Sequence, residues 1–220
     1  MDILAPGDVG TAAQAMAAGH LVAVPTSRWY MLCARASDTR ATAAIYAAKR
    51  RPARKPLLLV IGAPATARQL FDLTDAAHAL ISGLWPGDLA LRLPWLPGHL
   101  APEAIGAPAL VGCPDGVLGQ LARRVGEPLA ASAVSLSPPH ASPTDHPALT
   151  VADVAAFDTD QSARIAAVID GGICPQGQHM TIVDCPANGP TAIRREGTVH
   201  TRAVHAALDG AHLAGGQHVG

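Results

Sequence analysis

The chain has 220 residues, enough for one sizeable α/β domain and marginal for two. It is 49% apolar and 15% charged, so it can build a core and is too apolar for an intrinsically disordered protein. Its net charge of −1 argues against a protein that coats nucleic acid by bulk charge. The N-terminus does not read as a signal peptide and no segment reads as a membrane span, so we expect a soluble, cytoplasmic protein without a membrane partner.

The predicted elements mix helices and strands along the whole chain. The first helix runs from Asp8 to Ala18, with Asp8 as its N-cap and Gly19 just past its end. Strands are expected at 21–24, 31–34, 57–61, 89–93, 109–113, 129–131, 165–169, 181–184 and 192–194, and further helices at 39–48, 65–71, 75–83, 117–125, 150–156 and 198–208. This mixture predicts a single α/β domain over residues 1–209, followed by a mobile Gly/His tail at 210–220.

Metal and disulfide chemistry find little support in the sequence. The four cysteines are scattered without a CxxC pair, so we expect reduced, structural thiols. The ten histidines form no ligand spacing, and we therefore expect no protein metal site.

A basic cluster is the first feature with chemical content. Both lysines of the chain, Lys49 and Lys55, lie in a seven-residue window with three arginines. Such a cluster suits a polyphosphate or a carboxylate, because arginine donates bidentate hydrogen bonds and lysine acts as a point charge. A solvated helix C-terminus, where cations offset the helix dipole, is an equally good interpretation. Neither a P-loop nor a Rossmann glycine motif is present.

The loop at 132–147 is long enough to suggest a functional role. Its serines at 132, 135 and 137 could donate hydrogen bonds to phosphate, although their spacing alone favours a simple turn.

Several short motifs occur in a characteristic order over residues 9 to 200. They are Pro25-Thr26 with Tyr30, Lys49 with Arg51-Pro52, Lys55-Pro56-Leu57, Trp85-Pro86-Gly87, Pro128-Leu129 with Ser132, Ser142-Pro143-Thr144, Ile169-Asp170-Gly171-Gly172, Thr181 to Asp184, and Ile193 to Gly197. In this order they resemble the YrdC/Sua5 family of threonylcarbamoyl-AMP synthases.

The resemblance implies a twisted mixed sheet with flanking helices around a concave basic cavity. In that family the cavity holds ATP, and an amino acid that has captured bicarbonate as an N-carboxylate attacks the α-phosphate. Pyrophosphate leaves and an N-carbamoyl adenylate remains. ATP, bicarbonate and Mg²⁺ are thus implied, with tRNA reached only indirectly through a downstream acyltransferase. Cationic clamps and positioning carry such chemistry, so no side-chain nucleophile is required.

The resemblance also implies roles for individual residues. Lys49 and Arg51 match the family's K-x-R and would be the catalytic pair that holds the triphosphate and the carboxylate. The nucleotide would further be bound by Lys55, Ser132, Thr181 and Arg194, and the amino acid by Thr26, Arg28 and Tyr30.

This chain departs from the family pattern at several of these motifs. Arg28 replaces a small hydroxyl residue, Met31 a glycine, Gly112 an arginine and Val134 an asparagine. We therefore expect a divergent enzyme that forms a carbamoyl adenylate from an amino acid or amine other than, or as well as, threonine, in small-molecule biosynthesis, with Arg28 supplying the charge lost at Gly112.

Three alternatives remain open. They are ordinary threonylcarbamoyl-AMP synthesis for tRNA modification, carbamoyl transfer from a carbamoyl adenylate to a small-molecule acceptor, and a non-catalytic module that binds RNA or a nucleotide.

Overall fold

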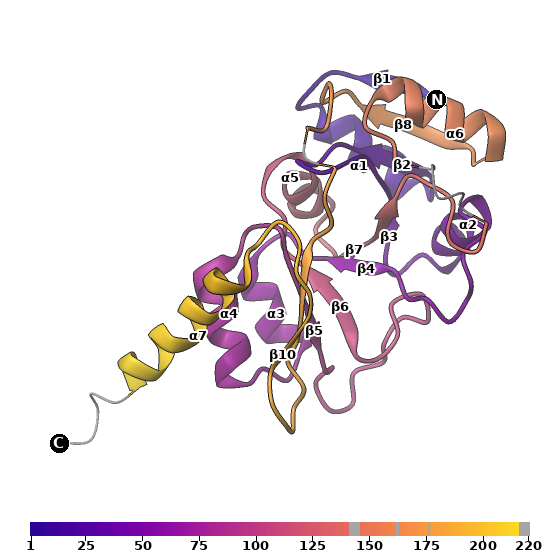
Figure 1. Ribbon diagram of the computed structural model, residues 1–220. Coiled ribbons are helices and arrows are strands. Elements are labelled where there is room, and N and C mark those ends of the chain that lie inside the picture. The colour runs from indigo at the N-terminus through magenta and orange to yellow at the C-terminus, as the bar shows by residue number, and fades with distance from the viewer. Residues whose placement is uncertain (141–145, 162, 176, 216–220) are drawn as a thin grey trace.

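A computed structural model describes residues 1–140, 146–161, 163–175 and 177–215 (Figure 1). The strands are β1 Asp2–Leu4, β2 Leu21–Val24, β3 Met31–Arg35, β4 Leu58–Val60, β5 Leu89–Leu93, β6 Ala109–Gly112, β7 Leu129–Ala133, β8 Ile165–Ile169, β9 Thr181–Asp184 and β10 Ala192–Arg195. The helices are α1 Val9–Ala17, α2 Thr39–Ala48, α3 Pro64–Leu70, α4 Asp75–Leu84, α5 Gly116–Val125, α6 Val151–Gln161 and α7 Thr201–Gly215.

All these strands belong to one mixed sheet, in the order β1-β8-β2-β3-β7-β4-β6-β5-β9-β10. The pairs β1/β8, β2/β8, β4/β6 and β5/β9 are parallel, and β2/β3, β3/β7, β4/β7, β5/β6 and β9/β10 are antiparallel. The predicted mixed α/β sheet is confirmed.

Two hydrophobic layers cover the two faces of the sheet. Successive strand residues point to opposite faces, so Leu58 and Leu59 of β4 belong to different layers. One layer contains Met16 of α1 and Leu121 of α5. The other contains buried residues of α2, α3, α4, α6 and α7, such as Ile45 of α2. Helices therefore lie on both faces.

The helix boundaries that rest on capping residues agree with the sequence. The Asp8 carboxylate accepts a hydrogen bond from the backbone N–H of Thr11 at 3.0 Å, and Asp38 accepts one from Ala41 at 2.9 Å. Each cap satisfies an N–H that the first helical turn leaves without a partner. The predicted starts of α1 and α2 are confirmed.

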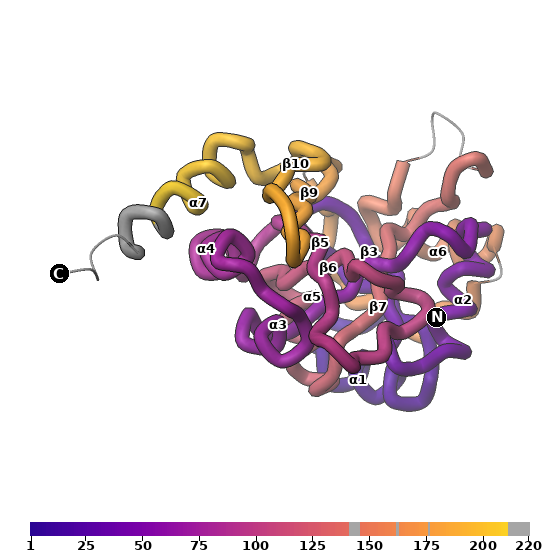
Figure 2. Tube along the Cα trace, turned by 90° about the horizontal axis from the view of Figure 1, so that it is seen from below, coloured from indigo at the N-terminus to yellow at the C-terminus, as the bar shows by residue number. Residues whose placement is uncertain are grey.

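Other boundaries differ from the expectation. The strand β1 was not predicted, and the helix predicted at 150–156 stops five residues before the end of α6. It placed α7 at 198–208, whereas the helix begins at Thr201 and continues to Gly215, into the stretch expected to be a tail. In Figure 2, α7 leads away from the sheet. The predicted Ser142-Pro143-Thr144 motif and residues 216–220 lie outside the described residues.

The four cysteines are free and buried, as expected. Within the described ranges, no helix combines the length and the apolar character that a membrane crossing requires.

Candidate active site

A cavity of about 260 Å³ opens on the sheet face that α1 and α5 cover elsewhere. Its floor consists of apolar side chains from five strands. They are Met31 of β3, Leu58 of β4, Ala90 of β5, Leu110 of β6 and Ala131 of β7. Among the described residues, no helix contributes to the lining, so the strands leave room for a ligand.

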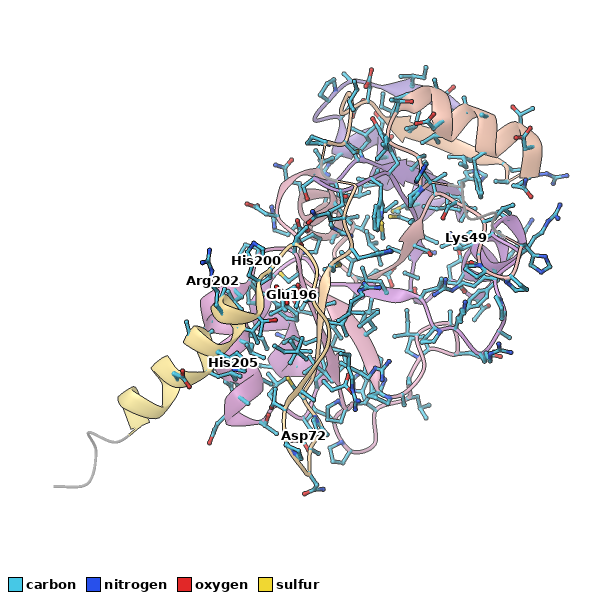
Figure 3. The ribbon with its side chains drawn as sticks, viewed as in Figure 1. Lys49, Asp72, Glu196, His200, Arg202 and His205 are labelled. Atoms are coloured by element: carbon cyan, nitrogen blue, oxygen red, sulfur yellow. The ribbon has the colours of Figure 1, made fainter. Side chains whose placement is uncertain are left out.

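Lys49 enters the cavity from the end of α2 and is labelled in Figure 3. Its side chain is buried, and its Nζ donates hydrogen bonds to the carbonyl oxygens of Ala133 and Ser135. Burial, and then the charge of Arg51, lower the pKa of Lys49 to about 7. An ammonium group has three protons, so the charged form keeps one donor for a ligand.

Arg51 lies in the same cavity and is fixed by the turn that follows α2. Its Nε donates to the Lys55 carbonyl at 3.0 Å, and its Nη2 donates to the Pro56 carbonyl at 2.7 Å. Burial lowers the pKa of this guanidinium, whereas the neighbouring Tyr46 raises it. These bonds fold the basic stretch back on itself, which brings Lys49 and Arg51 to one site.

Arg28 is the third cation of the cavity and is almost fully buried, at 2% exposed. Its Nε donates to Asp88 Oδ1 at 3.0 Å, and the hydroxyl of Ser27 donates to Asp88 Oδ2 at 2.7 Å. Burial lowers the pKa of Arg28, whereas the Asp88 charge raises it. Asp88 directly follows the Trp85-Pro86-Gly87 turn, so this motif holds the 26–30 loop against β5.

Arg195 and His179 complete the basic lining. Arg195 Nε donates to the Met180 carbonyl at 3.1 Å, and the His179 ring packs edge-on against Trp29 with centroids 4.9 Å apart. Burial lowers the pKa of Arg195, and the charge of Arg28 lowers it further. Burial also lowers the pKa of His179, together with the charges of Arg195 and Arg28. No acidic residue lines the cavity among the residues that the structure describes, so its lining favours an anion.

The structure brings together four of the residues singled out in the sequence. Lys49, Arg51, Ser132 and Arg28 line the cavity. Lys55 lies outside its lining, with Nζ 3.4 Å from the Pro138 carbonyl.

Thr26 and Tyr30 also lie outside the lining and instead shape the loop that carries Arg28. The Thr26 hydroxyl donates to the Trp29 carbonyl at 2.7 Å and accepts from the N–H groups of Arg28 and Trp29. The Tyr30 hydroxyl donates to the Gly172 carbonyl at 3.0 Å. Their direct contacts are with the loop and with residues 171–172.

Gly171 is required by the close approach of this loop. Its N–H donates to the Tyr30 hydroxyl at 3.1 Å, and a Cβ at this position would lie 2.5 Å from Cγ of Pro25. A side chain cannot be accommodated there without moving the backbone.

Thr181 and Arg194 lie outside the cavity lining. The Thr181 hydroxyl donates to the Val199 carbonyl at 2.5 Å and accepts from the N–H groups of Gly197 and Val199. Arg194 is exposed and donates from Nε to Asp184 at 2.5 Å. Its neighbour Arg195 lines the cavity instead, because the register of β10 against β9 shifts between Ile193 and Arg195 and places Arg195 opposite Ile182, which also lines the cavity. Strict alternation from Ile193, which packs against the opposite layer, would have selected Arg194, so the sequence held no signal that identifies Arg195.

The departures from the family motifs occupy different places. Met31 lines the cavity, whereas Val134 packs into the core of the opposite layer. At Gly112, a Cβ would lie 3.2 Å from the terminal methyl of Met180 and 3.5 Å from Leu58, both of which line the cavity. The position at 112 thus faces the cavity wall, and Met180 fills the space of a side chain there.

The described residues do not offer a resident Mg²⁺ site. They contain no group of three or more His, Cys, Asp or Glu side chains that could hold an ion, and the cavity is lined by basic groups. Hard divalent cations prefer carboxylate and carbonyl oxygens.

Comparison with known proteins identifies similar chains. The Sua5, YciO and YrdC family model, described as telomere recombination, matches residues 14–197. Threonylcarbamoyl-AMP synthase of Bacillus subtilis is 35% identical over 196 residues, which are 86% of this chain and 53% of that protein. A Mycobacterium tuberculosis relative is 32% identical over 211 residues, covering 93% of this chain and 92% of the relative.

Solved structures agree with the sequence comparison. Pyrococcus abyssi Sua5 in complex with L-threonine superposes with a TM-score of 0.81 at 26% identity, over 94% of this chain and 61% of that one. Escherichia coli YciO, at 17% identity and a TM-score of 0.72, shares the fold over 92% of this chain and 98% of its own. This chain spans about half the length of the Bacillus relative.

Proposed function

The chain belongs to the Sua5/YciO/YrdC family, and on that premise we propose that it forms a carbamoyl adenylate from ATP, bicarbonate and an amino acid. We further propose that the amino acid is L-threonine and the product threonylcarbamoyl-AMP. A B. subtilis relative is named for this synthesis, and a P. abyssi relative was crystallised with L-threonine. Transfer RNA is then the indirect destination of the product.

One observation carries the proposal: Lys49, Arg51 and Ser132 line a single basic cavity. Lys49 and Arg51 are buried or half-buried cations held by backbone carbonyls. Fixed cations in a water-poor site stabilise a phosphoryl group far better than they do in bulk water. This lining is what a triphosphate requires.

The chemistry can be followed at the atoms of the substrates. The amine of threonine captures bicarbonate as an N-carboxylate, with loss of water. An oxygen of that carboxylate attacks the α-phosphorus, a new P–O bond forms, and the bond from the α-phosphorus to the bridging oxygen breaks. Pyrophosphate leaves with the electron pair. Lys49 and Arg51 offset the charge of the transferring and leaving phosphates, and Ser132 donates to a phosphate oxygen.

The expectation of a different amine finds no support in the names of these relatives. Its motivation was the altered motifs, and one of them, Val134, packs into the core. We therefore place threonine first and treat another amine as an outcome of the experiment.

Pyrophosphate release from ATP, with bicarbonate, Mg²⁺ and a panel of amino acids and amines, tests the proposal. Release that depends on threonine, and that Lys49→Met abolishes, is the expected result. Arg54→Ala is a matched control, because Arg54 is exposed in the same basic stretch.

Other outcomes point to the alternatives. Release with a different amine replaces the substrate but keeps the reaction. Activity only with carbamoyl phosphate indicates carbamoyl transfer. Salt-sensitive RNA binding without ATP turnover indicates a binding module and contradicts the proposal.

A further inference from the structure

The cations of the cavity fall into two groups that are held by different parts of the chain. Lys49 and Arg51 lie on the turn after α2. Lys49 donates to carbonyls of β7 and of the loop that follows it, and Arg51 donates to carbonyls of the segment that precedes β4. Arg28 and Arg195 lie on the 26–30 loop and on β10. Burial is the main cause that lowers the pKa of Lys49 and that of Arg195. The charge of Arg51 adds to it at Lys49, and the charge of Arg28 adds to it at Arg195, so the two cations of each group lie close together.

Arg28 is built to present its charge to the cavity. The ion pair with Asp88 uses the Nε, and no second protein hydrogen bond to the guanidinium occurs in the part of the chain that the structure describes. The two terminal nitrogens are thus left for a ligand. A guanidinium held at Nε offers its remaining edge as a planar donor pair, which matches the two oxygens of a carboxylate.

The Asp88 carboxylate fixes the direction of Arg28 rather than contacting the ligand. It accepts from Arg28 and from the Ser27 hydroxyl, and it does not line the cavity. Asp88 neutralises one charge only, so Arg195 leaves this side of the cavity with a positive excess.

From these contacts we infer that Arg28, positioned by Asp88, binds the α-carboxylate of the amino-acid substrate and makes that carboxylate a requirement for binding. This inference rests on the proposed function, since it names the part of the substrate that the second group of cations recognises. The N-carboxylate of the same molecule is then directed toward the phosphates at Lys49 and Arg51.

Calorimetric titration of L-threonine and L-threoninol tests the inference without requiring turnover. Threoninol keeps the amine and the side-chain hydroxyl but replaces the carboxylate with an alcohol. The wild-type protein should bind threonine at least about 100-fold more tightly, and Arg28→Gln should reduce this preference to below about tenfold. Arg124→Gln, on the exposed side of α5, should leave it unchanged.

Two further variants separate binding from a structural role. Arg28→Lys should restore part of the preference, since it retains the charge without the planar fork, and Asp88→Asn should lower it while the affinity for ATP changes less than about threefold. A loop that merely collapsed would weaken both ligands alike.

Equal binding of threonine and threoninol by the wild type overturns the inference, whether or not any variant folds. An unchanged preference in a folded Arg28→Gln protein overturns it as well. The proposed function fails by a different result, the absence of a carbamoyl adenylate from the wild-type protein.

Discussion

Lys49 is a buried ammonium with two backbone acceptors and one proton to spare. Its pKa of about 7 lies below that of a free lysine, because burial and Arg51 both disfavour the charged form. Only the protonated form has a donor left for a phosphate. The state of this one group therefore governs anion binding near neutral pH.

We expect the affinity for pyrophosphate to fall as the pH rises above 7. A bound anion favours the charged form, so binding takes up a proton wherever the empty site has lost it. The dissociation constant should increase roughly tenfold between pH 7 and pH 8.5. Calorimetry in buffers of different ionisation enthalpy measures both the affinity and the proton uptake.

Lys49→Arg provides the control, since arginine stays charged over this range. A pH dependence that persists unchanged in that variant would assign the titration to another group.

Arg194 and Arg195 offer a test with adjacent residues. Arg195 lines the cavity, so Arg195→Ala should lower kcat/KM for adenylate formation about tenfold. Arg194→Ala should change it less than about twofold, because its partner Asp184 lies outside the lining. Steady-state pyrophosphate release compares the two, and the reverse order of effects would contradict the geometry.

The residue types of the site could be predicted from the sequence more reliably than which of their side chains point into the cavity. Lys49 and Arg51 were identified by their cluster and motif, and both line the cavity. Thr181 and Tyr30 belong to recognisable motifs, but a motif does not reveal whether a hydroxyl meets a ligand or the backbone. Only the hydrogen bonds of the folded chain decide that.

At the scale of elements, short polar connections hold the cavity walls in place. Thr181 at the start of β9 is fully buried and joins that strand to residues 197–199 through three hydrogen bonds. These bonds tie the segment between β10 and α7 to β9. They also explain why α7 begins at Thr201 rather than at the expected Thr198: the backbone at 198–199 is committed to residues 179 and 181.

Thr181→Val should destabilise the protein by about 2–3 kcal/mol, because it leaves the N–H groups of Gly197 and Val199 without their acceptor. Urea unfolding measures the difference. Thr198→Val is the matched control, since its hydroxyl lies 3.4 Å from the Asp88 carbonyl and should contribute less. Equal effects of the two substitutions would refute the role given to Thr181.

The elements with their own local signals were predicted best. Caps at Asp8 and Asp38 fixed the starts of two helices. The three-residue strand β1 has no such signal, since it depends on pairing with β8, more than 160 residues away in the chain. The order of the strands depends on these distant pairings, which periodicity does not report.

For the whole molecule, an almost neutral chain carries a strongly basic cavity. The net charge of −1 describes the total, whereas the cavity lining includes four Lys and Arg side chains. The acidic residues that the structure describes lie outside the cavity lining, and one of them, Asp88, pairs with the lining residue Arg28. The positive charge that phosphate binding needs therefore comes from the way the fold gathers a few cations, and the overall composition does not show it.

One measurement addresses the central claim most directly: mass spectrometry of the product formed from ATP, L-threonine and ¹³C-labelled bicarbonate. We predict threonylcarbamoyl-AMP that carries a single ¹³C, formed by the wild-type protein and absent with Lys49→Met. AMP released without a labelled adenylate, or a labelled adenylate formed equally well by Lys49→Met, would contradict the account.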